Sequence, residues 1–147
     1  ASDIKRSLFL GMNPSTTPKL NKNDSKKLTD GTHGLPGDYH CGWVIIPGEE
    51  GTINLPVKGL NASGTFYISS LNLPRHRIYA PQQIQLLKDG VAYKTIDLKP
   101  EDSPEKGEMM KATVPADLNG TEQLSIKISC LKKPGTQMGI DEIAFIP

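Results

Sequence analysis

The sequence has little of several features that mark particular classes of protein. Only two of its 147 residues are cysteine, and aromatic residues make up 5%. Lys and Arg total 17 against 16 Asp and Glu, so the formal net charge is +1. Nucleic-acid-binding proteins usually carry a clear excess of basic residues. Apolar runs such as Val-Ile-Ile at 44–46 are far too short to cross a bilayer. We therefore expect neither nucleic-acid binding nor membrane insertion.

Familiar catalytic motifs are also missing. There is no glycine-rich phosphate loop, no His-Glu-x-x-His and no Gly-x-Ser-x-Gly. His33 and His40 flank Cys41 without the spacing of zinc ligands, and a Cys–His nucleophile pair would need proximity in space. Cys130 lies on the apolar face of an alternating segment, which favours a small buried hydrophobe; pairing with Cys41 would need α-carbons within about 7 Å. The sequence does not predict an enzyme.

What the sequence does contain is a series of short alternating segments. Its 14 glycines and 12 prolines are spread along the chain and leave no stretch long enough for a good amphipathic helix. Segment 124–130 alternates Leu, Ile, Ile and Cys with polar residues, which is typical of a half-buried strand. We predict a single all-β domain over 1–147, a two-sheet antiparallel β-sandwich. The predicted strands are 7–10, 43–46, 52–57, 65–71, 83–87, 91–98, 109–114, 124–130 and 140–146.

Five motifs occur in a consistent order along the chain. They are Leu-Thr-Asp-Gly at 28–31, Gly-Asp-Tyr-His-Cys-Gly-Trp at 37–43, Ile-Asn-Leu at 53–55, Ile-Tyr-Ala-Pro at 78–81 with Asp-Gly at 89–90, and Gly-Ile-Asp-Glu-Ile at 139–143. This series resembles the galactose-binding-like β-sandwich family, which includes discoidin-type domains and carbohydrate-binding modules. The resemblance runs from about residue 20 to the C-terminus, after a leading segment and first strand within 1–20, and implies a jelly-roll sandwich.

The resemblance also implies a structural calcium ion between the Asp-Gly loop and the last strand. Calcium prefers six to eight hard oxygen ligands. The candidates are the carbonyl of Leu28, the carboxylates of Asp30 and Glu142, and the hydroxyl or carbonyl of Thr32. The alternative is that Asp30 only bonds backbone amides in an Asx-turn completed by Gly31, with Glu142 in solvent.

Ligands of this family bind on the loops at one end of the sandwich. Aromatic rings pack on the apolar face of a sugar, and fork-shaped donors reach its oxygens. Two loops carry such groups, and their candidate residues are Tyr39, His40, Arg75, His76, Arg77 and Tyr79. We expect Trp43, the only tryptophan, to lie in the core. The low aromatic content favours a small site for a terminal sugar over a flat polysaccharide platform, and the paired arginines favour a sugar that bears an acidic group or many acceptor hydroxyls.

Two functions from different classes fit these observations. The first is a non-catalytic carbohydrate-binding accessory domain of a larger secreted or cell-surface protein. The second is a structural or protein-contact domain that supports a neighbouring catalytic domain and binds no sugar. Exposed polar and aromatic groups at the loop end would favour the first, whereas a continuous apolar patch on a sheet face would favour the second.

Overall fold

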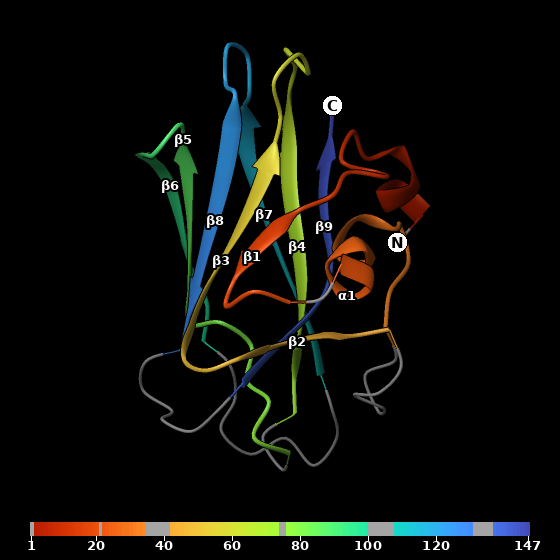
Figure 1. Cartoon of the computed structure of the whole chain (residues 1–147), viewed down its shortest axis with the longest axis vertical. Helices are drawn as coiled ribbons and strands as arrows, with labels where there is room; N and C mark the ends of the chain where they lie inside the picture. Colours follow the sequence, from red (N-terminus) through yellow and green to blue (C-terminus); the bar gives the residue numbers. More distant parts are fainter. Residues whose placement is uncertain (1, 21, 35–41, 74–75, 100–107, 131–136) are drawn as a thin grey trace.

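Two antiparallel sheets pack face to face in the computed structural model, which describes residues 2–20, 22–34, 42–73, 76–99, 108–130 and 137–147 (Figure 1). One sheet has the order β1-β3-β8-β5-β6 and the other has the order β2-β9-β4-β7. The strands are β1 (Ser15–Thr17), β2 (Val44–Pro47), β3 (Glu50–Pro56), β4 (Ser63–Asn72), β5 (Gln83–Lys88), β6 (Val91–Asp97), β7 (Glu108–Asp117), β8 (Gln123–Ser129) and β9 (Gln137–Ile146). The predicted two-sheet antiparallel β-sandwich is confirmed.

Strand β8 shows how the alternating pattern produces the sandwich. Leu124, Ile126 and Ile128 are buried, with exposures of 1%, 0% and 1%, while Lys127 faces solvent. Because β8 lies between β3 and β5, this strand contributes an apolar stripe to the centre of one sheet. Ser125 lies on the outer face as predicted, and its hydroxyl donates a hydrogen bond to the side-chain oxygen of Asn54 on β3.

The predicted strand at 7–10 is wrong. Its residues form turns, and the first strand is β1, further along the chain. The Ser7 hydroxyl accepts hydrogen bonds from the amides of Phe9 and Phe145, at 3.0 and 2.9 Å. Such a local side-chain bond to the backbone competes with a sheet ladder. Phe9 still reaches the core, where its ring stacks on Phe145 at 5.7 Å.

Two apolar clusters are buried. The main cluster lies between the sheets and includes Phe66, Ile126 and Phe145. The smaller cluster contains Trp43, Leu71, Leu73 and Ile78, with Ile45 and Met109 packed against it. Trp43 is 6% exposed, which confirms its expected place in the core. Cys130 is buried as predicted, whereas Cys41, its possible partner, lies outside the described residues.

The helical segments are short and lie near β9 (Figure 1). They are η1 (Ser2–Arg6), α1 (Lys22–Lys26) and η2 (Lys27–Thr29), of which η1 and η2 are 3-10 turns. Both η1 and η2 contact β9, and this places the Asp-Gly loop that follows η2 beside the last strand. Within the described part of the chain, no helix has the length and apolar character needed to cross a membrane.

Candidate functional site

The turn between Leu73 and Ile78 presents the cationic loop expected from the sequence. The amide of Leu73 donates to the carbonyl of Ile78 at 2.8 Å, and the amide of Ile78 donates back at 3.3 Å. Arg77 has a φ of 57°, which lies in the left-handed region that residues other than glycine rarely adopt. Its carbonyl accepts from the amide of Gln137 at 3.0 Å, which ties the turn to β9. The side chains of His76 and Arg77 are exposed.

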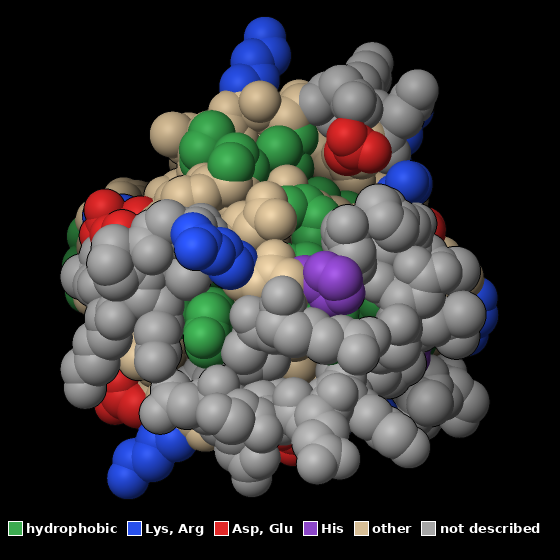
Figure 2. Space-filling view, turned by 90° about the horizontal axis from the view of Figure 1, so that it is seen from below, with side chains coloured by type: hydrophobic (Ala, Val, Ile, Leu, Met, Phe, Trp, Pro, Cys, Tyr) green, Lys and Arg blue, Asp and Glu red, His purple; other side chains and the backbone are tan. Residues whose placement is uncertain are grey.

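The smaller apolar cluster anchors both candidate loops at one end of the sandwich. Trp43 follows the first loop, while Leu73 and Ile78 bracket the second, and all three belong to this cluster. In the view from below, a histidine and basic side chains are visible at this end (Figure 2). Tyr79 is partly buried against the main core, so it is less available than Arg77. Tyr39, His40 and Arg75 lie outside the described residues.

A β-bulge in β9 directs two neighbouring carboxyl groups at the segment after η2. Ser69 of β4 pairs with Glu142, but Ser70 pairs with Ile140, so Asp141 is the extra residue. Neighbouring residues in a regular strand point to opposite faces, and a bulge re-aims them. As a result, Asp141 bonds the amide of Gly34 while Glu142 bonds the amide of Gly31, and both carboxyl groups are fully buried.

Asp141 is the centre of a buried polar network. One of its oxygens lies 2.7 Å from Nδ1 of His33 and accepts from the Gly34 amide at 2.9 Å. The other accepts from the hydroxyl of Ser69. Nε2 of His33 lies 3.3 Å from the hydroxyl of Tyr67, and the two rings meet edge to face at 6.0 Å. The network joins β9 and β4 to the loop that contains His33.

The network contains Ser, His and Asp, but it is not arranged as a nucleophilic triad. In such a triad, the nucleophile's hydroxyl bonds the imidazole nitrogen that the carboxylate does not bond. Here Ser69 donates to Asp141 itself, and the far nitrogen of His33 faces Tyr67. Burial, together with the nearby carboxylates of Asp141 and Glu142, raises the pKa of Tyr67 and keeps its phenol neutral. The network around Asp141 holds the segment that contains His33 and Gly34 against β9.

Glu142 and Asp30 come together as the calcium prediction requires. Oε2 of Glu142 accepts from the Gly31 amide at 2.9 Å, whereas Oε1 is buried with no hydrogen-bond partner among the described residues. Burial raises the pKa of Glu142 to about 9, helped by the neighbouring carboxylate of Asp30 and opposed by the Gly31 amide. Glu142 is therefore protonated at neutral pH in the metal-free protein. The alternative of a solvated Glu142 is wrong.

The other two predicted ligands, Thr32 and Leu28, lie in the segment that contains Asp30. Thr32 donates both its amide, at 3.0 Å, and its hydroxyl, at 2.8 Å, to Oδ1 of Asp30, forming the Asx-turn of the alternative reading. Leu28 lies in η2 with its side chain in the main core. Among the described residues, no three or more His, Cys, Asp or Glu side chains are arranged so that they alone could hold a metal ion. The carboxyl groups of Asp30 and Glu142 can bind a calcium ion only if carbonyl, hydroxyl or water oxygens complete its coordination shell.

Sequence reasoning missed the network around Asp141. In the sequence, Asp141 and Glu142 are two adjacent acids of a predicted strand, and nothing in the pattern around 141 indicates a bulge. His33 is notable only for its place near Cys41, and Tyr67 and Ser69 are residues within a predicted strand. Their partners are 34 to 108 residues away in sequence, so no local spacing reveals them.

Comparison with known proteins gives structural matches only. No family model matches the sequence, and no curated protein matches it. A fucose-binding module from Streptococcus pneumoniae superposes with a TM-score of 0.60 at 8% identity, covering 95% of this chain and 94% of that one. The lectin domain of lectinolysin, solved with Lewis B antigen, also gives 0.60 at 9% identity, covering 99% of this chain and 96% of that one. The chain shares their fold. This agrees with the β-sandwich of carbohydrate-binding modules that the motifs predicted.

Proposed function

We propose that this domain is a non-catalytic carbohydrate-binding domain whose site is the end that carries His76 and Arg77. The observation that carries the proposal is the turn from Leu73 to Ile78, held by backbone bonds on both sides and leaving Arg77 exposed in a left-handed conformation. Uncommon backbone conformations persist only where the surroundings over-determine them, and they concentrate at binding sites. The two similar structures, a fucose-binding module and a lectin domain, support the same class of function.

The chemistry of this turn favours a sugar that carries an anionic group or many acceptor oxygens. Arg77 offers five N–H donors and no acceptor, and His76 beside it can add a further donor. In a chain whose net charge is only +1, two adjacent basic side chains on one tight turn are a local concentration of donors. A terminal acidic sugar would use both.

A glycan array tests the proposal. The domain should bind sugars with a carboxylate or sulfate at the non-reducing end, and binding should weaken as salt rises, because exposed charges are screened within about 10 Å at 0.1 M ionic strength. Binding to no glycan would favour the alternative, a structural or protein-contact domain. That alternative has little support on the surface: the large hydrophobic side chains exposed in the described residues are Leu10 and Val91, on separate elements.

We also propose that the Asp30–Glu142 pair holds a structural calcium ion. The open, buried Oε1 of Glu142 and the facing carboxylate of Asp30 support this, since a cation would replace the proton that Glu142 otherwise carries. Thr32, already bonded to Asp30, and the carbonyl of Leu28 would supply further oxygens. The ion would join the Asp-Gly loop to β9 and stabilise the fold.

Chelation tests the calcium site. Binding only to the native state adds about 2.7 kcal/mol at a hundredfold excess over Kd, so calcium should raise the melting temperature by roughly 5–10 °C relative to chelator. Asp30→Ala should abolish this difference, whereas Asp24→Ala, a partly exposed acid of α1, should preserve it. Identical melting curves for the wild type with and without calcium would exclude the site.

We place the domain in a secreted or cell-surface protein, next to another domain of the same chain. The support is the shared fold with a binding module and with one named domain of a larger protein. Fractionation of the source cells with an antibody to this domain checks the location, and a cytoplasmic signal would contradict it.

A further inference from the structure

The turn that joins β7 to β8 contains the only Asn-Gly pair in the sequence, Asn119–Gly120. It lies beside the connection from β3 to β4, at the end of the sandwich opposite the connection from β4 to β5 (Figure 1). Both residues of the pair are exposed, and Gly120 has a φ of 72°. The amide of Thr121 donates to the carbonyl of Leu118 at 3.1 Å, which closes the turn. A chemically labile pair therefore lies at the tip of a closed, solvent-facing turn.

An Asn-Gly pair can react with itself and with water. The backbone nitrogen of the glycine attacks Cγ of the asparagine, so that an N–Cγ bond forms and the Cγ–Nδ2 bond breaks. The amide proton is lost to solvent, Nδ2 gains a proton, and ammonia leaves. Water then opens the succinimide ring at either carbonyl and yields aspartate or isoaspartate. Glycine favours this reaction because it has no Cβ beside its nitrogen and its backbone turns freely. Asn119 is therefore the first asparagine of this chain expected to convert.

The folded turn holds both reacting groups. Nδ2 of Asn119, the leaving group, donates to Oδ1 of Asp117 at 2.6 Å. The attacking nitrogen, that of Gly120, donates its hydrogen to Oδ1 of Asn61 at 3.2 Å. The backbone amide of Asn119 also donates to Oδ1 of Asp117, at 2.9 Å. Asn61 and Asp117 thus form a clasp, in which the nucleophile and the leaving group are each bonded to another residue.

The clasp is anchored to the sandwich and carries a charge. The amide of Asp117 donates to the hydroxyl of Tyr93 at 3.0 Å, and its carbonyl accepts from Nζ of Lys88 at 2.6 Å. Hydrogen bonds from the amide and side chain of Asn119 lower the pKa of Asp117, so this carboxyl group is ionised at neutral pH. A nearby negative charge disfavours loss of the Gly120 amide proton, which the attack requires. Both the bonds and the charge of the clasp oppose the reaction.

We propose that Asn119 is a site of spontaneous deamidation whose rate is set by the clasp of Asn61 and Asp117. The turn must open locally before the Gly120 nitrogen can reach Cγ of Asn119, because both groups are bonded elsewhere while it is closed. The product cannot rebuild the clasp, since a carboxylate at 119 lacks the Nδ2 donor and lies beside the ionised Asp117. Conversion is therefore one-way, and it adds a negative charge to a chain whose formal net charge is +1.

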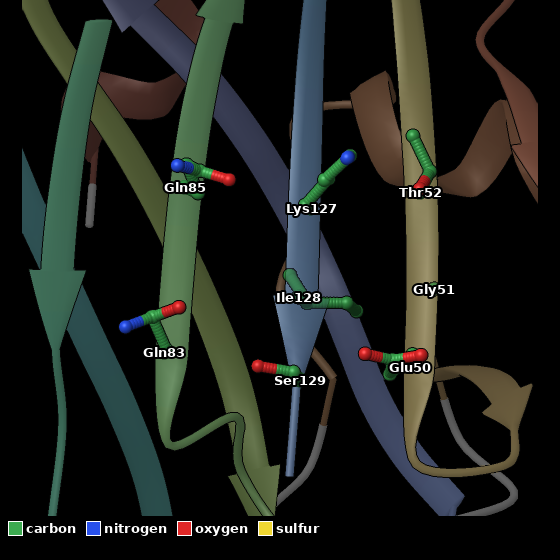
Figure 3. A pocket seen from close by; sticks show the side chains of 8 residues that line it. All are labelled: Glu50, Gly51, Thr52, Gln83, Gln85, Lys127, Ile128 and Ser129. Carbon is green, nitrogen blue, oxygen red and sulfur yellow. The ribbon is translucent and has the colours of Figure 1, made fainter. Parts of the chain in front are cut away.

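Peptide mass spectrometry after incubation at mildly alkaline pH tests the site. The peptide with Asn119 should gain the mass of an NH2-to-OH exchange before the peptides with Asn54 or Asn61, which leucine and alanine follow. Gln83 and Gln85 on the outer face of the five-stranded sheet (Figure 3) are slower internal controls, because no glycine follows either residue and glutamine would form a larger ring. No exchange at 119, or earlier exchange at Asn54 or Asn61, would overturn the proposal.

Clasp variants test whether the fold sets the rate. A synthetic peptide of residues 114–124 should convert at least tenfold faster than the folded protein, because its turn need not open first. Asp117→Ala and Asn61→Gly, which suits the φ of 42° at that position, should each speed conversion about 2- to 10-fold, the factor that one net hydrogen bond contributes. Lys111→Ala, an exposed change on β7, should keep the wild-type rate. Wild-type rates in both clasp variants, or equal rates for the peptide and the folded protein, would contradict the role of the clasp.

Discussion

The buried carboxyl of Glu142 shows how strongly the surroundings of a residue can change its pKa. In solution a glutamic acid is ionised at neutral pH, but here burial and the carboxylate of Asp30 raise its pKa to about 9. The hydrogen bond from the Gly31 amide favours the ionised form but does not overcome burial and the effect of Asp30. A protonated Glu142 is thus a neutral member of the core until a cation displaces its proton.

This pKa has a consequence for stability in the metal-free protein. The folded state keeps a proton on Glu142 up to about pH 9, while the unfolded chain loses it near pH 4.5. Folded molecules therefore bind more protons between these values, and the free energy of unfolding falls as pH rises through this window. Glu142→Gln, which resembles the protonated acid, should remove this part of the decline in melts with chelator between pH 5 and pH 9.

The matched control for this prediction is Glu122→Gln. Glu122 is an exposed acid, 3.7 Å from Lys58, and should follow the wild-type pH profile. Parallel pH profiles for the wild type and Glu142→Gln would show that the pKa of Glu142 is not raised.

Among the elements, β9 links the sandwich to the loops. Its bulge at Asp141 lets one strand hold Gly31 through Glu142, and Gly34 and His33 through Asp141. The same strand holds the turn around Arg77, because the amide of Gln137 donates a hydrogen bond to the carbonyl of Arg77. The two proposed functional regions, the calcium pair and the sugar-binding turn, are therefore positioned by one strand.

Breaking the Asp141 network should strongly destabilise the domain. Asp141→Ala leaves the Gly34 amide and His33 without their buried partner, and each buried donor left unsatisfied costs about 1–3 kcal/mol. Removing the exposed partner Glu122 should cost about 0–1 kcal/mol. Urea unfolding measures both. If Asp141→Ala does not fold, Asp141→Asn, which keeps one acceptor, should fold with an intermediate loss; equal stabilities for the Asp141 and Glu122 variants would contradict the role of the network.

The strands were predictable where burial follows strict alternation, as at Leu124, Ile126 and Ile128. The conformation of the segment around Phe9 was not predictable, because this segment buries apolar side chains although it forms a turn. The Ser7 hydroxyl stabilises that turn by accepting a hydrogen bond from the amide of Phe145, 138 residues away in sequence. Within the site, the sequence suggested the meeting of Asp30 with Glu142 through a family motif. It could not reveal the contact of His33 with Asp141, since that contact depends on a bulge and on pairing between distant strands.

At the scale of the whole molecule, the sandwich separates its surfaces by chemistry. One end exposes basic side chains on a rigid turn, the outer face of the five-stranded sheet exposes polar side chains together with Glu50 and Lys127, and most large apolar residues are packed inside. The fold it shares with a fucose-binding module and a lectin domain is compatible with many loop functions, because fold alone does not fix function. Under the proposed function, the exposed side chains of His76 and Arg77 at the turn would decide which sugar this chain binds.

The most direct test of this account is titration calorimetry of an acidic glycan from the array against the wild type, Arg77→Ala and Lys111→Ala. Hydrogen bonds to charged groups contribute about 1.5–3 kcal/mol, so Arg77→Ala should weaken binding by about 10- to 100-fold. Alanine adds no new type of backbone strain at φ 57°, since arginine already pays that cost. Lys111→Ala should bind like the wild type. Equal affinities for all three proteins would contradict the claim that the end bearing Arg77 is the sugar-binding site.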